Sequence, residues 1–552
     1  MKKRITKIVT IISIVITSIF TVGFTDSYFE VSKNLDIFAT LFRELNIYYV
    51  DDANPGDLMK TGIDAMLESL DPYTNYIPES KMEDYKMMTT GQYGGIGALI
   101  QTKGDHVIIS EPYEGFGADK AGLMAGDKIL KIDGNDAKGK NSTEIREFLL
   151  GQPGTTLELV IERPGTKEQL TKTVTREEVK IKDVPYAGMV DDSIGYIRLT
   201  GFTESASSEV KAALNKLKEK GANKIVLDLR GNGGGLLRES VNIVNFFVDQ
   251  GTPVVSTKGK IKDWDKKYIA LSTPIDTEIP LVILINGGSA SASEIVSGSL
   301  QDNDRAVVMG SLSFGKGLVQ QVRPLSYNSK LKVTVAKYYT PSGRCIQKLD
   351  YSNKNKAGKA DEIPDSLITE FKTINSKRTV FDGKGVSPDI EVKNKILSDI
   401  ATSLLLKSLF FDYATEFRIK HDSIAKVEDY SLSDEDYDDF VDFLSDKDYE
   451  YTTKSEDVLA SLQKVAKEES SFDNVKEEYE ALKTKLIHSK KEDLNKFKDE
   501  ITKILESEIV SRYYYQTGQI KIALKHDIIL DEAIKTLKDE ELYKSILAGT
   551  RD

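Results

Sequence analysis

A buried strand that runs directly into a glycine turn and a helix is the feature that most restricts how this chain can fold. Residues 279–285 are continuously apolar and rich in β-branched side chains, which is typical of a buried strand. Asn286-Gly287-Gly288 then predicts a tight turn, and apolar residues recur at helical spacing from Ile295 to Leu300. The junction of strand and helix therefore carries three serines, at positions 289, 291 and 293.

This junction suits a nucleophile, because the first amides of a helix lack partners within the helix and can bind a developing oxyanion. Serines at such a position are also ordinary helix N-caps. The junction alone leaves both interpretations open.

A second strand of the same kind lies earlier in the chain. Residues 224–229 again read as buried, and they are followed by Arg230-Gly231-Asn232-Gly233-Gly234-Gly235. The run lacks the lysine and serine or threonine of a Walker phosphate loop. Because glycines let backbone amides approach a ligand closely, this turn suits an oxyanion hole.

Hydrolysis by a serine needs a base, and the familiar base is histidine. All four histidines, at positions 106, 421, 488 and 526, lie far in sequence from the serines. Lys316 is nearer, between Gly315 and Gly317 and just before the β-like residues 318–322.

A lysine acts as a base only when neutral, so its pKa must fall from about 10.4 toward 7, which corresponds to roughly 4 to 5 kcal/mol. Small neighbours allow the amine to approach the hydroxyl and exclude water; here these are Gly315, Gly317, Ala290 and Ala292. The alternative interpretation of Lys316 is a solvated turn lysine.

Four motifs together resemble the C-terminal processing, or tail-specific, serine proteases, over roughly residues 30–392. They are Asp228 to Gly235, the SASASEI run from Ser289 to Ile295, Phe314 to Gln321, and Gly385 to Ile390. The resemblance implies a multidomain α+β and α/β protein. It would have a crotonase/ClpP-like α/β protease core, an inserted PDZ-like β-rich domain, N-terminal helices and a C-terminal helical extension.

The resemblance also implies roles for single residues. Ser291 matches the nucleophile, Lys316 the base, and Gln320 the glutamine that orients the lysine. The amide of Ala292 would form one half of the oxyanion hole, and a glycine of the 233–235 run, with Gly234 preferred, the other half. Many relatives carry proline where this chain has Gly233, which leaves the choice of glycine open. Asp302, near a position that the family usually keeps acidic, reads as structural.

The segment before these motifs resembles a PDZ domain of the bacterial protease type, over roughly residues 91–178. Tyr93 to Gly97 opens a strand, and a short helix, a turn and a strand follow within Ala121 to Gly134. Such domains add a peptide as an extra strand and capture its terminal carboxylate with loop amides. That loop would be Gly94, Gly95, Ile96 and Gly97. The alternative is a small β-rich spacer.

Composition agrees with this plan and excludes other classes. The 552 residues are enough for three or four domains, and the net charge of −12 argues against a nucleic-acid partner. The single cysteine, Cys345, excludes an internal disulfide. No zinc-ligand spacing is present, so we expect neither a metal nor another cofactor.

The N-terminus has the order of an export signal. Lys2, Lys3, Arg4 and Lys7 precede an apolar run over residues 8–24. No good cleavage site follows, so a removed signal peptide and an uncleaved membrane anchor fit equally well. We expect an exported protein of the bacterial cell envelope or periplasm, with anchoring to the inner membrane as one alternative. A cytoplasmic chain that begins with a buried helix is another.

These observations divide the chain into five regions. They are a signal peptide or anchor (1–26), N-terminal helices (27–90), a PDZ domain (91–178), a protease core (179–392) and a C-terminal helical domain (393–552). Helices like those of 27–90 commonly cap the protease in the family and can carry homodimer contacts; packing is the safer interpretation here. The role of the C-terminal region stays open among substrate holding, self-association and spacing.

The sequence thus predicts an exported endopeptidase that recognises exposed apolar C-terminal tails of proteins through its PDZ domain and cleaves through an acyl-enzyme. Two other classes remain. One is a PDZ-based scaffold with an inactive protease domain, against which the intact serine, lysine and glutamine motifs argue. The other is a serine hydrolase that uses a histidine.

Overall fold

The structure is a computed structural model that describes residues 28–166, 168–355, 358–393, 396–486 and 490–550. The chain forms two compact units. One contains the residues before Ile77 together with 331–333, and the other contains 77–330 and 334–552.

The first unit is helical. Residues 28–48 are helical and are followed by α2 (Pro55–Glu68), in line with the N-terminal helices predicted for 27–90. Asn54 caps α2 by accepting from the Gly56 amide at 2.9 Å, and Pro55 occupies the first helical position. The chain leaves this unit within β1 (Asn75–Ile77).

The β-rich insertion follows α3 (Met82–Thr90). Its sheet has the order β3-β4-β5-β7-β8, with short β6 beside β5 and antiparallel neighbours throughout. The strands and helices of this part are β3 (Ala98–Lys103), β4 (His106–Pro112), α4 (Gly117–Lys120), β5 (Lys128–Ile132), β6 (Asn135–Asp136), α5 (Ser142–Leu149), β7 (Thr156–Glu162) and β8 (Gln169–Thr175). A separate pair, β2 (Gln92–Gly95) and β9 (Glu177–Lys180), stands at its two ends in the sequence.

A six-stranded sheet forms the centre of the second unit. Its order is β10-β11-β12-β15-β16-β23, parallel from β11 onward, with β10 antiparallel at one edge. The strands are β10 (Tyr186–Met189), β11 (Ile194–Arg198), β12 (Lys224–Asp228), β15 (Leu281–Ile285), β16 (Val307–Gly310) and β23 (Ile390–Glu391). The two apolar runs of the sequence are thus the neighbouring strands β12 and β15.

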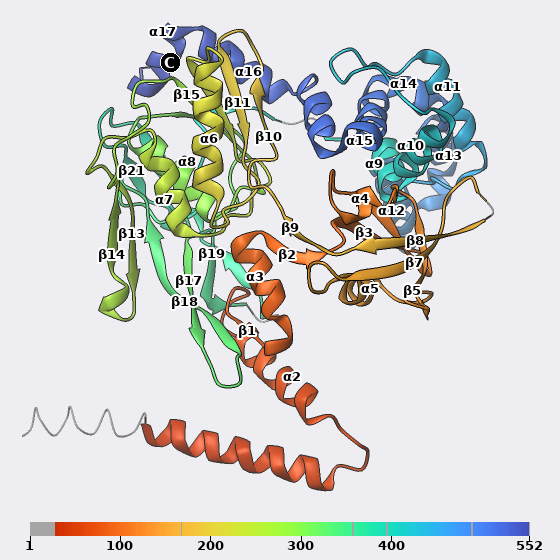
Figure 1. The fold of residues 1–552 in the computed structure, drawn as a ribbon. Coiled ribbons are helices and arrows are strands. Elements are labelled where there is room, and N and C mark those ends of the chain that lie inside the picture. The colour runs from red at the N-terminus through yellow and green to blue at the C-terminus, as the bar shows by residue number, and fades with distance from the viewer. Residues whose placement is uncertain (1–27, 167, 356–357, 394–395, 487–489, 551–552) are drawn as a thin grey trace, which may run out of the picture. The chain divides into compact units, whose positions relative to one another are not determined.

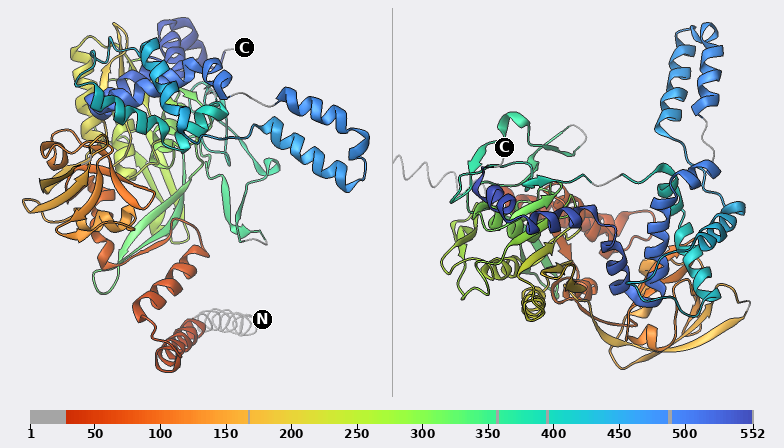
Figure 2. Two further views of the ribbon diagram at one scale, coloured as in Figure 1. Left: turned by 90° about the vertical axis from the view of Figure 1, so that its right-hand side faces the viewer. Right: turned by 90° about the horizontal axis from the view of Figure 1, so that it is seen from above.

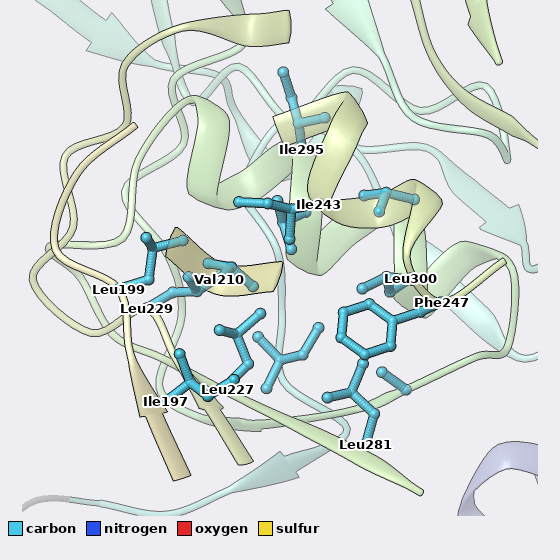
Figure 3. Close-up of a cluster of buried hydrophobic side chains, with 14 of the residues drawn as sticks. Ile197, Leu199, Val210, Leu227, Leu229, Ile243, Phe247, Leu281, Ile295 and Leu300 are labelled. Atoms are coloured by element: carbon cyan, nitrogen blue, oxygen red, sulfur yellow. The ribbon is translucent and has the colours of Figure 1, made fainter. Parts of the chain in front are cut away.

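One face of this sheet packs against α6 (Ala206–Glu219), α7 (Leu237–Asn245) and α8 (Ala292–Asp302). Leu281, Ile283 and Ile285 of β15 point to this side, where they join Val210, Ile243 and Ile295 from the helices. Figure 3 shows part of this cluster, including Phe247 and Leu300. Every residue of α8 is buried, so the helix that follows the serines is fixed along its whole length.

The other face of the sheet is covered by the last two helices of the chain, α16 (Ile528–Lys538) and α17 (Glu540–Ala548). Val282 and Leu284 of β15 point to this side and pack with Leu530, Ala533 and Leu537. Figure 1 shows both helices, in dark blue, next to the sheet. The end of the predicted C-terminal helical region therefore completes the core of the sheet.

A second sheet contains β13 (Pro253–Gly259), β14 (Lys266–Ile269), β17 (Leu318–Pro324) and β18 (Lys330–Tyr339). Two small hairpins follow it. They are β19 (Leu349–Lys354) with β20 (Ala360–Glu362), and β21 (Glu370–Lys372) with β22 (Thr379–Phe381).

The remaining helices build a core of their own, mainly from α9, α10, α11 and α15. Their bounds are α9 (Asp399–Leu406), α10 (Leu409–Lys420), α11 (Asp434–Phe443), α12 (Lys454–Glu468), α13 (Lys476–Leu486), α14 (Lys490–Lys496) and α15 (Lys498–Leu524). Helices α12 and α13 lie side by side as a hairpin (Figure 2). The acidic segment around α11 is amphipathic, because Tyr437 and Phe440 are buried.

None of the helices in the described part of the chain is long and apolar enough to cross a membrane. The apolar run predicted as a signal or anchor, residues 8–24, lies outside the described residues.

Packing of α16 on the sheet gives a stability prediction. Leu530→Ala removes a side chain that is 2% exposed and should lower the free energy of unfolding by about 2 to 5 kcal/mol, because the buried site cannot collapse fully. Ile528→Ala on the same helix, where the side chain is 43% exposed, is the control and should change it by less than about 0.5 kcal/mol. Urea unfolding measures both. Equal effects would contradict the packing of α16 as a core element.

Candidate active site

Three loops converge at the carboxyl ends of neighbouring parallel strands. They follow β12, β15 and β16 and contain, in order, Gly234, Ser291 and Lys316. The carboxyl ends of parallel strands meet at one edge of a sheet, which is where open α/β sheets bind ligands. The fold therefore brings together turns that are distant in sequence.

Ser291 stands at the N-cap of α8 in a strained conformation. Its φ is 56° and its ψ is −109°, which is unusual for a residue with a side chain. The Ser291 carbonyl accepts from the Ile295 amide at 2.9 Å and from the buried Tyr338 hydroxyl at 3.2 Å. These two bonds hold the serine in this conformation at the start of a fully buried helix.

Glu294, one helical turn after Ser291, links the serine turn to the lysine turn. Its carboxylate accepts from the Ser291 amide at 2.7 Å and from the Lys316 amide at 2.9 Å, both at Oε2. Its other oxygen, Oε1, accepts from the Gly315 amide at 2.7 Å and the Ser313 hydroxyl at 2.5 Å. One buried carboxylate thus fixes the backbone of both predicted dyad residues.

Burial raises the pKa of Glu294, and its four donors act in the opposite direction. The side chain is fully buried, so its oxygens depend on these donors in place of water. Ser313 in turn accepts from the Val386 amide at 2.7 Å, which orients its own proton toward Glu294.

The glycines around Lys316 pack closely against a later segment of the chain. A Cβ on Gly315 would lie 2.5 Å from Lys348 Cβ, and one on Gly317 would lie 2.8 Å from the Gln347 amide nitrogen. The Gly317 amide also donates to Gln347 Oε1 at 2.8 Å. The glycines therefore let the turn pack against residues 347–348, which fixes the lysine backbone.

Gln320 lies on β17, within the β-like segment predicted at 318–322. Its Nε2 donates to Thr334 Oγ1 on β18 at 3.1 Å. This bond ties the amide of Gln320 to the neighbouring strand.

Gly234 is the glycine that approaches the serine most closely. A Cβ there would lie 2.9 Å from both Ser291 Cβ and the Ala292 amide nitrogen, whereas one on Gly233 would meet nothing within 4 Å. Gly234 also has a φ of +96°, which favours glycine. Its amide donates to Asn232 Oδ1 at 2.9 Å.

Asn232 and two of the serines join the glycine turn to the serine turn. The Asn232 carbonyl accepts from the Ala290 amide at 3.0 Å and the Ser293 hydroxyl at 2.9 Å. Ser289 donates to the Leu229 carbonyl at 2.8 Å. Ser289 and Ser293 are fully buried, whereas Ser291 is partly exposed. Ser291 is thus the serine of the three that reaches the surface.

A buried ion network starts the glycine turn. Asp228 accepts from Arg230 Nη2 and from the Tyr196 hydroxyl, each at 2.6 Å, and pairs with Arg198 at 2.7 Å. Burial raises the pKa of Asp228, but the two arginines lower it by more. The pKa of Asp228 therefore lies below its usual value. Asp527 supplies a second carboxylate to Arg230.

The described histidines find partners elsewhere. His106 bonds Asp105, His421 bonds the Phe417 carbonyl, and His526 bonds Glu506. His488 lies outside the described residues. Asp302 is buried and pairs with Arg344 at 2.9 Å, which fits a structural role. Within the described part of the chain, no His, Cys, Asp and Glu side chains form a group able to hold a metal ion.

Of the predicted PDZ loop, Gly94 and Gly95 are the last residues of β2, and Ile96 and Gly97 connect it to β3. Two of the loop carbonyls accept hydrogen bonds from the backbone of the same domain. The Gly94 carbonyl accepts from the Gly151 amide at 3.1 Å, and the Ile96 carbonyl accepts from the Ala118 amide at 2.7 Å. Gly97 has a φ of +72°, and a Cβ there would lie 2.4 Å from Phe116 Cβ. Strand β3 ends the sheet order, and α5 lies beside it.

Sequence reasoning assigned no role to Glu294, Asn232, Asp228 or Arg230. For Glu294 a signal was present, because serine followed three residues later by glutamate is the capping-box pattern. The contacts of Asn232, Asp228 and Arg230 connect loops that are far apart in sequence, so no local sequence pattern predicts them.

Comparison with known proteins gives three family matches. Peptidase family S41 matches residues 193–352, a PDZ domain matches 85–162, and the C-terminal helical domain of a probable PDZ-protease matches 400–537.

Individual proteins agree. The carboxy-terminal-processing protease of Bartonella bacilliformis is 39% identical over 319 residues, which is 57% of this chain and 73% of that protein. The carboxy-terminal processing protease CtpA of Bacillus subtilis is 29% identical over 67% of this chain and 77% of that protein. Among solved structures, the photosystem II D1 C-terminal processing protease is 29% identical, with a TM-score of 0.35 and coverage of 65% of this chain and 93% of that chain.

The family matches and the Bartonella relative confirm the predicted fold class and the family resemblance. A PDZ domain, a protease domain and a C-terminal helical domain follow one another along the chain. The chain belongs to the carboxy-terminal-processing serine proteases of peptidase family S41.

Proposed function

We propose that Ser291 is the nucleophile of this protease and that neutral Lys316 is its general base. Ser291 Oγ attacks the carbonyl carbon of the scissile peptide bond while Lys316 Nζ takes the hydroxyl proton. The lysine then gives that proton to the leaving amine. Water, deprotonated by the same lysine, hydrolyses the acyl-enzyme.

The observation that carries this proposal is the Glu294 carboxylate. Because it bonds the amides of both Ser291 and Lys316, the two residues keep a fixed backbone geometry without any histidine. Preorganisation of this kind is worth several kcal/mol to a reaction between two positioned groups. Gln320 would hold the lysine amine in line, since its own amide is anchored on Thr334.

The oxyanion would be bound by the amides of Ala292 and Gly234. Ala292 is the first residue of α8, so its amide has no acceptor one turn earlier in the helix. Gly234 lies against Ser291, which supports it over Gly233. In this role its amide exchanges the Asn232 side chain for the oxyanion.

The PDZ domain would deliver protein C-termini. Strand β3 offers an edge to which a tail can add as a further strand, with the terminal carboxylate at the Gly94 to Gly97 loop. Leu99 on β3 and Phe148 on α5 are 47% and 40% exposed. These side chains favour apolar tails over acidic ones.

A PDZ scaffold with an inactive protease domain is the second candidate. It would have no use for a strained serine and for a carboxylate bonded to both turns. Export to the cell envelope, membrane anchoring and homodimer formation stay predictions from the sequence.

Single replacements in the dyad test the chemistry. Ser291→Ala and Lys316→Ala should each lower kcat for an unfolded, apolar-tailed protein by about 10⁴-fold or more, because each removes a group that acts in the bond-breaking step. The exposed lysine variant Lys260→Ala is the control and should cleave like wild type. Product formation is followed by electrophoresis. Equal cleavage by all variants would reject the dyad.

Glu294→Gln tests the shared carboxylate. The glutamine NH₂ group would face backbone amides that now donate to Glu294, so at least one hydrogen bond to the serine or lysine turn is lost. We expect kcat to fall by about 10²-fold, with KM changed by less than about threefold. Glu239→Gln is the matched control, because Glu239 is also buried and accepts from a backbone amide, that of Ser207, at 2.9 Å. Steady-state kinetics and thermal unfolding of both variants give the comparison. Equal losses of kcat would reduce Glu294 to a general stabilising role.

Leu99→Asp and Phe148→Asp test tail recognition. Each replaces apolar contact with a charge, so KM for an apolar-tailed protein should rise by about tenfold, with kcat unchanged. Leu271→Asp is the control, since Leu271 is 71% exposed on the protease part. A rise in KM for this control as well, or for neither PDZ variant, would argue against the proposed tail site.

A further inference from the structure

Asp527 connects the C-terminal end of the chain to the loop beside the nucleophile. Its carboxylate accepts from Arg230 Nη1 at 3.1 Å and from Arg230 Nη2 at 2.5 Å, a two-point pairing. The same carboxylate caps α16, accepting from the amides of Ile529 and Leu530 at 3.0 and 3.1 Å. The Arg230 and Asp527 side chains are only 13% and 14% exposed, so water screens the pair weakly.

The position of Asp527 is set by the core. Helix α16 packs on the protease sheet through Leu530, Ala533 and Leu537, which are at most 2% exposed. Asp527 is the N-cap of this helix and therefore has little freedom to follow Arg230 if the arginine moves. The carboxylate acts as a fixed point for the guanidinium.

Arg230 is the first residue of the glycine turn. Its amide and guanidinium both bond Asp228 at the end of β12. The next residues, Gly231, Gly234 and Gly235, all have φ values between 72° and 155°, a conformation that glycine does not hold by itself. The contacts of Arg230 at the start of the turn therefore influence how closely Gly234 approaches Ser291.

Charge balance points the same way. Asp228 and Asp527 together offset Arg198 and Arg230. These four side chains form one neutral group around the buried Asp228. Loss of the Asp527 charge leaves Arg230 with one carboxylate, which it shares with Arg198. With its charge incompletely paired, Arg230 is more stable in contact with water, and its movement toward water would displace the glycine turn.

We propose that Asp527 is a positioning residue of the protease. It holds Arg230 and, through it, the glycine turn in place against Ser291. The residue lies far beyond the S41 match at 193–352, so the C-terminal region contributes to the geometry of the active site. This inference rests on the proposed oxyanion role of Gly234.

Asp527→Asn is the informative variant, because asparagine caps a helix as well as aspartate does but carries no charge. We expect kcat to fall by about tenfold or more, the effect of losing a charge-assisted hydrogen bond, with KM within about twofold of wild type. The matched control is Asp539→Asn on α17, where Asp539 caps by accepting from the Leu542 amide at 2.9 Å and is exposed. This control should keep wild-type kcat.

Hydrogen exchange supplies a readout that does not depend on cleavage. Amides of residues 230–235 should exchange faster in Asp527→Asn than in wild type and Asp539→Asn, while α16 keeps its protection. Unchanged exchange in this turn, or equal kcat for the two asparagine variants, would overturn the positioning role. If Ser291→Ala cleaves like wild type, the proposed dyad fails instead, and exchange alone decides whether Asp527 holds the turn.

Discussion

The carboxylate of Glu294 is the interaction on which the rest of the site depends. It is fully buried, and burying a charge without partners would cost far more than a domain can offset. Four donors from two loops compensate for the lost water, and two of them are the amides of Ser291 and Lys316. Burial of Glu294 therefore fixes the position of the serine turn relative to the lysine turn. If either turn moved, part of the buried carboxylate would be left unpaired. The serine and the lysine lie in turns that follow different strands, β15 and β16, and the carboxylate joins these turns.

Much of the fold could be predicted from the sequence because its signals are local. The apolar runs at 224–229 and 279–285 identify β12 and β15, and the glycines after them mark the turns. The second face of β15 shows where local signals end. Val282 and Leu284 had to be covered by something, but only the folded chain reveals that Leu530, Ala533 and Leu537 cover them. Contacts across some 250 positions leave no periodicity to read, so the last two helices looked like part of a separate helical region.

The site divides in the same way. Ser291, Lys316 and Gln320 were predicted from family motifs, and the fold brings the turns of Ser291 and Lys316 to one edge of the central sheet. The glycines beside Lys316 also fit against Gln347 and Lys348, about thirty residues later, a contact that spacing cannot show. Asn232 was passed over inside a glycine run, although its backbone and side chain bond both neighbouring turns. Polar residues that join loops are found by accounting for buried donors and acceptors, which requires coordinates.

The loops around Ser291 are fixed by hydrogen bonds, and one of these bonds, between Gly234 and Asn232, competes with the proposed oxyanion role of Gly234. The amide of Gly234 donates to Asn232 Oδ1, while the Asn232 carbonyl and Nδ2 are held by Ala290, Ser293 and Leu199. For Gly234 to bind the oxyanion, its amide has to turn from an acceptor that is itself fixed. A neutral amide oxygen is a weaker acceptor than the negatively charged oxygen of a tetrahedral intermediate. The exchange is therefore favoured in the transition state and not in the free enzyme, so this half of the oxyanion hole would form as the reaction proceeds.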